Sequence, residues 1–122
     1  MRILAIDADE YYHRSLKEAL EPHHQLRLAA TVRAAKLALQ EFEPEAVITE
    51  LLLPDQTGYD FLESLFNRSG ANNLLTIVFT RIDNLEDIAA VLALGVNHYL
   101  VKGRDRVADL NNLLLTLQTN AL

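Results

Sequence analysis

Short apolar segments alternate along the chain with longer segments in which apolar residues recur at helical spacing. The short segments are rich in strand-forming residues and are bounded by polar ones, a pattern typical of β-strands. They lie at residues 2–6, 26–30, 45–49, 74–80 and 97–101. Tyr12, Leu16 and Leu20 illustrate the helical spacing of the intervening segments. Five strand–helix repeats predict an α/β domain, doubly wound, with a mostly parallel sheet and helices on both faces.

Polar residues and glycines mark where the predicted helices begin and end. Thr31 is expected to cap the helix that follows the second strand. Asp83, with Glu86 three residues later, predicts the start of the fourth helix, and Gly95 predicts its end. Asp105 is expected to cap the last helix. No linker or repeat divides this succession of elements.

Composition limits the classes of protein that the chain can represent. Its 122 residues, half of them apolar and 23% charged, suit a single domain over residues 1–122 with a substantial core. The lack of cysteine excludes disulfides and thiolate metal sites. A net charge of −6 argues against direct nucleic-acid binding, and no apolar run is long enough to span a membrane. We therefore expect a cytoplasmic protein, and a linker or output domain beyond residue 122 stays open.

Polar side chains follow four of the predicted strands at the point where each strand ends. They are Asp7, Glu50, Thr80 and Lys102. In an open parallel sheet, ligands bind outside the carboxyl ends of the strands, so these side chains are expected to converge on one edge. Two acids, a hydroxyl and an ammonium can bind a cation, a phosphate or one another.

Four sequence motifs resemble the response regulator receiver domain, the CheY-like module of bacterial two-component signalling. They are ILAIDADE, VITELLLPDQTG, IVFT and HYLVKG, and together they extend over nearly the whole chain. The resemblance implies the flavodoxin-like fold, with five parallel strands in the order 2-1-3-4-5. It also implies a signalling function, in which an aspartate at the end of the third strand accepts a phosphoryl group with the help of Mg²⁺.

Two departures from the family affect the phosphoacceptor site. The family's Mg²⁺-binding acidic pair falls on Asp7 and Ala8, and its phosphoacceptor on Glu50. Ala8 removes a carboxylate, so we predict no cofactor, with weak Mg²⁺ binding at Asp7 and Glu50 as the alternative. A glutamate carboxylate lies roughly 1–1.5 Å beyond that of aspartate, which disfavours phosphoryl transfer because that reaction depends on position. Glu50 is therefore either a fixed substitute for phosphoaspartate, bonded to Lys102 and Thr80, or the remnant of an acceptor.

The remaining family positions lie on the last two strands and the turns after them. Thr80 and Tyr99 match the hydroxyl and aromatic positions that change on activation, and Lys102 matches the lysine that ends the fifth strand. Arg81 stands where the family prefers a small residue, and we expect it to pair with the acceptor position or to cover the pocket. Gly103 replaces the family's proline, so a trans peptide is expected before it.

Three functions follow from these residues. The first is a non-enzymatic pseudo-receiver, independent of phosphorylation, that binds a protein partner or a second copy. The resemblance implies that this binding uses the fourth helix, the fifth strand and the fifth helix. The second is a residual Mg²⁺-dependent, phosphoryl-accepting response regulator. The third is a small-ligand or metal sensor at the same edge of the sheet. Ala8 and Glu50 together favour the first.

Overall fold

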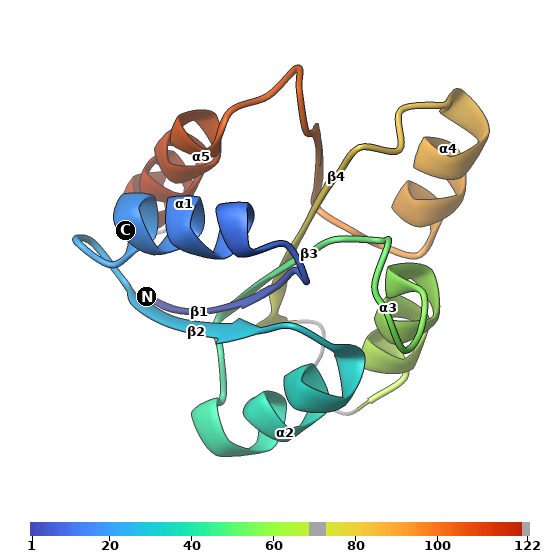
Figure 1. The fold of residues 1–122 in the computed structure, drawn as a ribbon, viewed down its shortest axis with the longest axis horizontal. Helices are drawn as coiled ribbons and strands as arrows, with labels where there is room; N and C mark the ends of the chain where they lie inside the picture. Colours follow the sequence, from blue (N-terminus) through green and yellow to red (C-terminus); the bar gives the residue numbers. More distant parts are fainter. Residues whose placement is uncertain (69–72, 121–122) are drawn as a thin grey trace.

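The five strands form one parallel sheet. The computed structural model describes residues 1–68 and 73–120, drawn as a ribbon in Figure 1. The strands are β1 (Arg2–Ile6), β2 (Gln25–Ala29), β3 (Ala46–Thr49), β4 (Leu75–Thr80) and β5 (His98–Val101). Their order is β2-β1-β3-β4-β5, and every neighbouring pair is parallel. The predicted doubly wound fold and its strand order are confirmed.

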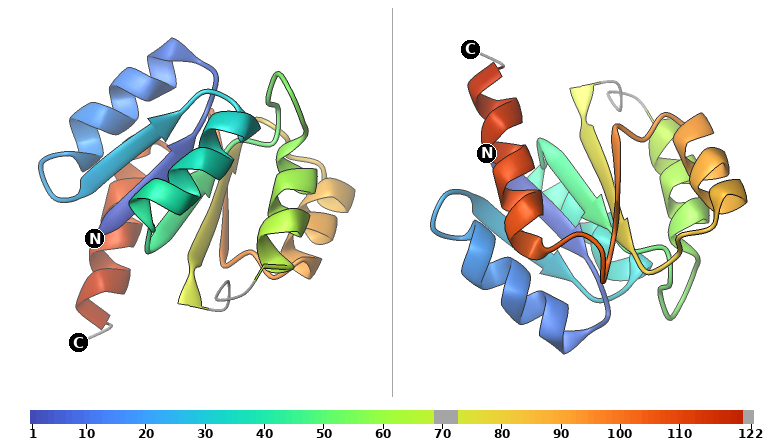
Figure 2. Two further views of the ribbon diagram at one scale, coloured as in Figure 1. Left: turned by 90° about the horizontal axis from the view of Figure 1, so that it is seen from below. Right: turned by 90° about the horizontal axis from the view of Figure 1, so that it is seen from above.

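In the described residues, five α-helices cover the two faces of this sheet. They are α1 (Glu10–Leu20), α2 (Val32–Phe42), α3 (Gly58–Phe66), α4 (Leu85–Ala93) and α5 (Val107–Asn120). Helices α1 and α5 lie side by side on one face, whereas α2 and α3 cover the other and α4 lies next to α3 (Figures 1 and 2). The apolar residues separate into two clusters that correspond to these faces.

Successive residues of β1 serve opposite clusters of the core. Leu4 and Ile6 pack with the apolar residues of α2 and α3, whereas Ile3 and Ala5 pack with those of α1 and α5. All four side chains are at most 1% exposed. A strand stretch buried on both faces has to be apolar, so the first polar side chain after Ile3–Ile6 is the one beyond the carboxyl end of the strand.

Helix ends agree with the sequence at two positions and differ at a third. Thr31 caps α2 as predicted, and Gly95 follows α4 with a φ of +113°, a conformation that favours glycine. The predicted cap at Asp83 is wrong by one residue, because α4 is capped by Asn84. Asparagine caps as well as aspartate does, so the Asp83–Glu86 spacing competed with an equally good signal one residue later.

The register of the sheet aligns the ends of its strands. Ile6 of β1 is paired with Thr49 of β3, and Thr80 of β4 is paired with Val101 of β5. The next residue in the chain is an acid after β1 and after β3, and a lysine after β5. Strand pairing alone therefore brings these charged side chains to one edge.

Candidate functional site at the carboxyl edge of the sheet

Three buried ionisable side chains meet at this edge. The Lys102 ammonium donates hydrogen bonds to Oδ2 of Asp7 at 2.6 Å and to Oε2 of Glu50 at 2.7 Å. Asp7, Glu50 and Lys102 are only 4%, 5% and 7% exposed. We call these three residues the acid–lysine cluster. Three of the four edge residues identified in the sequence are thus in direct contact.

An aromatic ring also contacts the Lys102 ammonium. Nζ lies 3.9 Å from the ring centre of Tyr12 in α1, a geometry that cation–π attraction favours. Burial acts to lower the pKa of Lys102, but its hydrogen bonds and charge interactions with Asp7 and Glu50 outweigh burial and raise the pKa above the ordinary 10.5. Lys102 is therefore a cation at neutral pH, held between two acids.

The Glu50 carboxylate turns back toward its own loop. Its Oε1 accepts hydrogen bonds from the amides of Leu51, at 2.7 Å, and Leu52, at 3.1 Å, while Oε2 faces Lys102. The predicted bond between Glu50 and Thr80 is wrong, because the Thr80 hydroxyl accepts instead from the amide of Ile82, at 3.4 Å. The extra methylene of glutamate allows this backward turn, so the two nearest amides satisfy the oxygen that we expected to reach β4.

The loop between β3 and α3 is held by the Asp55 side chain and by close backbone packing at the start of α3. The Asp55 carboxylate accepts hydrogen bonds from the amides of Val32, at 2.9 Å, and Arg33, at 3.0 Å, at the start of α2. These bonds lower the pKa of Asp55. Where α3 begins, a Cβ on Gly58 would lie 2.3 Å from the carbonyl oxygen of Glu50. Only glycine allows α3 to begin so close to the candidate site.

Tyr99 is linked to the connection between β4 and α4. Its hydroxyl donates to the carbonyl oxygen of Ile82 at 2.7 Å, and the half-buried ring packs against the core beneath α2, α3 and α4. Burial raises the pKa of Tyr99 to about 12, and the charges of Asp87, Glu50 and Asp83 act in the same direction. The Ile82 amide also donates to the Thr80 hydroxyl at the end of β4. Ile82 is therefore hydrogen-bonded to both predicted switch residues, Thr80 and Tyr99.

The mouth of the site is open. Ala8 and Arg81 are exposed and line a cleft of about 330 Å³ together with the acid–lysine cluster. Arg81 lies at the pocket as expected, but the ion pairs of the described residues join Glu50 to Lys102 and not to Arg81. Asp9, also on the cleft, accepts from the amide of Tyr11 at 2.8 Å and caps α1. The Asp9 carboxylate, one residue after Ala8, is thus occupied in capping α1.

The turn after Lys102 differs from the one that proline would form. Gly103 has a φ of +92°, and the peptide bond before it is trans, as expected. The predicted cap of α5 at Asp105 is wrong, because its carboxylate accepts from the Val101 amide at 2.7 Å. Asp105 therefore closes the turn onto β5, at the base of Lys102, and leaves the helix end to other residues.

Mg²⁺, which the resemblance implies, does not fit the donors of this edge. Asp7 and Glu50 each give one carboxylate oxygen to the Lys102 ammonium, and Ala8 supplies no ligand. Within residues 1–68 and 73–120, no group of three or more His, Cys, Asp or Glu side chains is arranged to hold a metal ion. A divalent cation would have to share both acids with an ammonium that they already bind, and the two cations would repel each other.

Several contributors to the site were not identified from the sequence. The sequence indicates only that Tyr12 belongs to the apolar stripe of a helix. The contact of its ring with the Lys102 ammonium depends on how α1 packs. Asp55 carries a weak signal, since it follows a proline in a turn-like stretch, but its bond to α2 spans more than twenty residues. The backbone amides that hold Glu50 carry no sequence signal at all.

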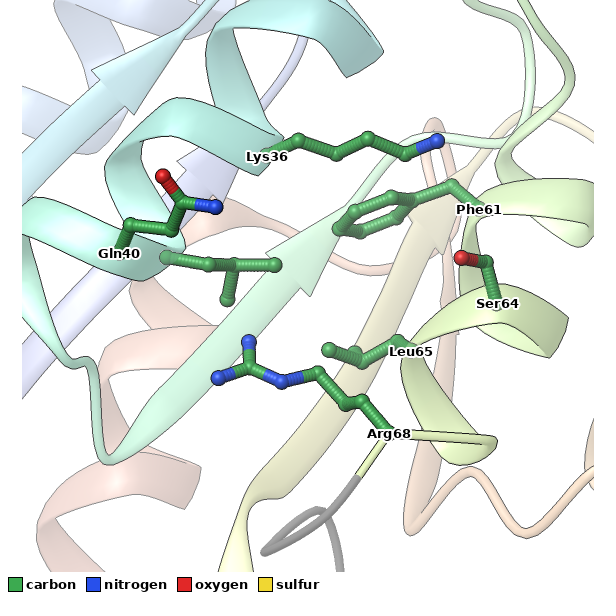
Figure 3. A pocket seen from close by; sticks show the side chains of 7 residues that line it. Lys36, Gln40, Phe61, Ser64, Leu65 and Arg68 are labelled. Atoms are coloured by element: carbon green, nitrogen blue, oxygen red, sulfur yellow. The ribbon is translucent and has the colours of Figure 1, made fainter.

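A second cavity lies away from this edge, in the groove between α2 and α3 (Figure 3). Its volume is about 340 Å³, and its rim carries polar side chains: Lys36 and Gln40 from α2, Ser64 from α3 and Arg68 just after α3. Figure 3 shows the Lys36 side chain extending toward α3 and the Arg68 guanidinium turned toward α2. This groove shares no residue with the acid–lysine cluster and is separate from the candidate site.

A sheet of this order, with an acid after β3 and a lysine after β5, defines a CheY-like signalling domain. The sequence pattern of the response regulator receiver domain matches residues 3–113. The photosynthetic apparatus regulatory protein RegA of Rhodovulum sulfidophilum is 30% identical over 119 residues, 97% of this chain. The virulence transcriptional regulatory protein PhoP of Salmonella typhimurium is 30% identical over 103 residues, 84% of this chain. The chain belongs to the response regulator receiver domain family.

Solved structures agree with this assignment. The Mn²⁺-bound response regulator Rcp1 superposes with a TM-score of 0.79 at 26% identity, covering 97% of this chain and 91% of that one. A two-component response regulator from Clostridium difficile gives a TM-score of 0.82 at 22% identity, covering 98% and 93%, and supports the fold alone. The chain spans 62% of RegA and 45% of PhoP. None of the helices in the described residues has the length and apolar character that crossing a membrane requires.

Proposed function

We propose that this receiver domain is a pseudo-receiver, a cytoplasmic protein-interaction module of two-component signalling whose state does not depend on phosphorylation. The observation that carries the proposal is the state of the Glu50 carboxylate. Its Oε2 binds the Lys102 ammonium, and its Oε1 binds the amides of Leu51 and Leu52. An acceptor has to direct a free oxygen at the incoming phosphorus in line with the leaving group. Glu50 is instead a fixed ligand of the lysine.

The lost acid at Ala8 supports the same conclusion. Phosphoryl transfer concentrates negative charge, which the metal ion neutralises in the family's reaction. The two remaining acids, Asp7 and Glu50, both bind Lys102, so a metal would compete with the cluster. The edge therefore combines an acceptor of the wrong length with an impaired metal site, and each change alone disfavours phosphorylation.

A domain that does not switch by phosphorylation acts through its surface. We place the partner-binding surface on α4, β5 and α5, where a protein partner or a second copy docks. Leu85 and Leu92 of α4 support this assignment, since they are 83% and 44% exposed. Large apolar side chains at such exposure favour burial by another protein. The output of the complete protein then depends on the partner or on a domain beyond this chain.

The proposal is tested by asking whether the chain accepts a phosphoryl group. The natural protein and the double variant Ala8→Asp/Glu50→Asp are incubated with Mg²⁺ and acetyl phosphate, and intact masses are measured over time. We expect the natural protein to remain unmodified and the double variant to gain one phosphoryl group. Comparable modification of both proteins would show a residual receiver instead. Thermal stabilisation of the natural protein by Mg²⁺ alone would favour a metal sensor.

A further inference from the structure

A third cavity lies between α3 and α4, on the side of α4 that faces α3. Its volume is about 290 Å³. Most of its walls are apolar, contributed by the two loops that border the candidate site and by the facing helices: Leu51, Leu52, Tyr59, Ile82, Ala90 and Val91. The two helices that flank it lie side by side in every view (Figures 1 and 2). It is separate from the groove of Figure 3, which lies between α2 and α3.

The cavity has a buried floor and an exposed apolar edge. Leu51 and Val91 are 6% and 2% exposed, so they are fixed parts of the core. Leu52, beside them, is 62% exposed, although the sequence could place a polar residue there at no cost to the core. A concave site with an apolar floor and an exposed leucine at its rim suits the insertion of one large apolar side chain.

The charged residues on the α4 side of the cavity are acidic. Asp87 lines it, Glu86 lies exposed in the first turn of α4, and Asp83 lies exposed just before the helix cap. No lysine or arginine is among the described residues that line it. The charges of Asp87 and Asp83 act together with burial to raise the pKa of Tyr99, so their negative potential extends inward from this surface. A positively charged ligand is complementary to this surface, whereas a two-fold contact between copies would place acids against acids.

We infer that the cavity between α3 and α4 is a docking site for a basic segment of a partner protein, which inserts one large apolar side chain beside Leu52. This docking site is additional to the surface on α4, β5 and α5. The inference holds whether or not Glu50 accepts a phosphoryl group. The inserted side chain contacts Leu51, Ile82 and Val91, and flanking lysines or arginines face the acids of α4.

The site is connected to the switch residues through the backbone. The amides of Leu51 and Leu52 bind the Glu50 carboxylate, and the carbonyl of Ile82 binds the Tyr99 hydroxyl. Leu51, Leu52 and Ile82 form walls of the cavity. A ligand in the cavity therefore rests on the two loops whose positions the acid–lysine cluster and Tyr99 fix, and its binding reports their conformation.

Two alanines on α4 provide a matched pair of variants. Ala90 lines the cavity, whereas Ala89 does not, and both are exposed. Asp87, Ala90 and Val91 share one face because they are three and four residues apart, and Ala89 points elsewhere. Ala90→Arg fills the cavity, Ala89→Arg adds the same charge to the same helix, and arginine is a good helix former at both positions.

The test uses two short end-blocked peptides, one with a phenylalanine flanked by lysines and one with the same phenylalanine flanked by glutamates. Amide spectra of the full chain are recorded during titration with each. We expect the lysine peptide to give saturable shifts at Leu51, Ile82 and Val91, with affinity at least about tenfold lower in Ala90→Arg and within about twofold of wild type in Ala89→Arg.

Three results of the peptide titrations would overturn the inference. The first is the absence of saturable shifts with the lysine peptide, and the second is equal binding of the glutamate peptide. The third is equal weakening by Ala90→Arg and Ala89→Arg, which would show a charge effect without insertion. Sedimentation without peptide is measured in parallel, because self-association that Ala90→Arg abolishes would identify a second copy as the occupant and also refute the proposed partner.

Discussion

Replacing Lys102 by methionine tests whether the acid–lysine cluster is a buried electrostatic unit. The substitution keeps most of the side-chain volume and removes the ammonium, so the two acids are left facing each other at 4% and 5% exposure. We expect a large loss of folding stability, because two like charges then share a buried site. The loss should be smaller at low pH, where one of the two carboxylates is protonated.

The magnitude follows from the geometry. At the observed 2.6 and 2.7 Å, each contact is worth at most about 6 kcal/mol with an effective dielectric constant of 20. Desolvation of the three groups and repulsion between the acids offset much of this, and breaking comparable buried pairs costs about 3–5 kcal/mol. The pKa of Lys102 is raised above 10.5 in the folded state. The stability that it supplies is therefore complete below pH 10.5 and is lost as the pH rises through the higher folded value.

The assay is urea denaturation of wild type and Lys102→Met at several pH values. The control is Arg27→Met, which breaks a contact of the same length, 2.7 Å to Glu41, between side chains that are 38% and 51% exposed. An exposed pair contributes about 0–1 kcal/mol. If Lys102→Met cost no more than Arg27→Met, and the difference from wild type persisted unchanged at strongly alkaline pH, the cluster would not be a buried electrostatic unit.

Three further substitutions test the loops around the cluster. Gly58→Ala places a Cβ 2.3 Å from the Glu50 carbonyl oxygen; denaturation should show a loss of about 1–3 kcal/mol, and wild-type stability would disprove the close packing. Asp55→Asn removes an anionic acceptor from the start of α2. Because backbone bonds lower the pKa of Asp55, its contribution is present above pH 3.8 and lost as the pH falls through the lowered value, so the variant and wild type should converge in acid, and a constant difference would argue against this bond. Tyr99→Phe removes the bond to Ile82 and should cost about 0.5–1.5 kcal/mol in thermal or chemical denaturation, with an unchanged stability contradicting it.

The fold could be predicted because the strand segments and the helix segments have clearly different patterns of apolar residues. The β1 segment is apolar from Ile3 to Ile6, as a strand buried on both faces has to be, and α1 carries an apolar stripe at helical spacing. Alternation of the two kinds of element predicts parallel strands, and parallel strands bring their carboxyl ends to one edge. The meeting of Asp7, Glu50 and Lys102 thus follows from the order of the elements, without knowledge of any loop.

The orientation of each polar group within the site could not be predicted. Glu50 has several acceptors and donors within reach, and the choice between Thr80 and the two following amides depends on the path of the loop backbone. The same limit explains Asp105, whose carboxylate is satisfied by Val101 and not by the helix after it. Hydrogen bonds to backbone groups compete closely in energy, so residue type alone does not select among them.

The central claim, that phosphorylation does not control this receiver domain, is tested most directly by amide spectra of the natural protein. The spectra are recorded for the protein alone, for the protein with Mg²⁺, and for the protein with Mg²⁺ and a small phosphodonor. The account predicts that the resonances of Asp7, Glu50 and Lys102 stay in place throughout. Shifts at these residues with Mg²⁺ that spread to Thr80 and Tyr99 when the phosphodonor is added would contradict it, because the site would then bind metal, accept the phosphoryl group and transmit the change.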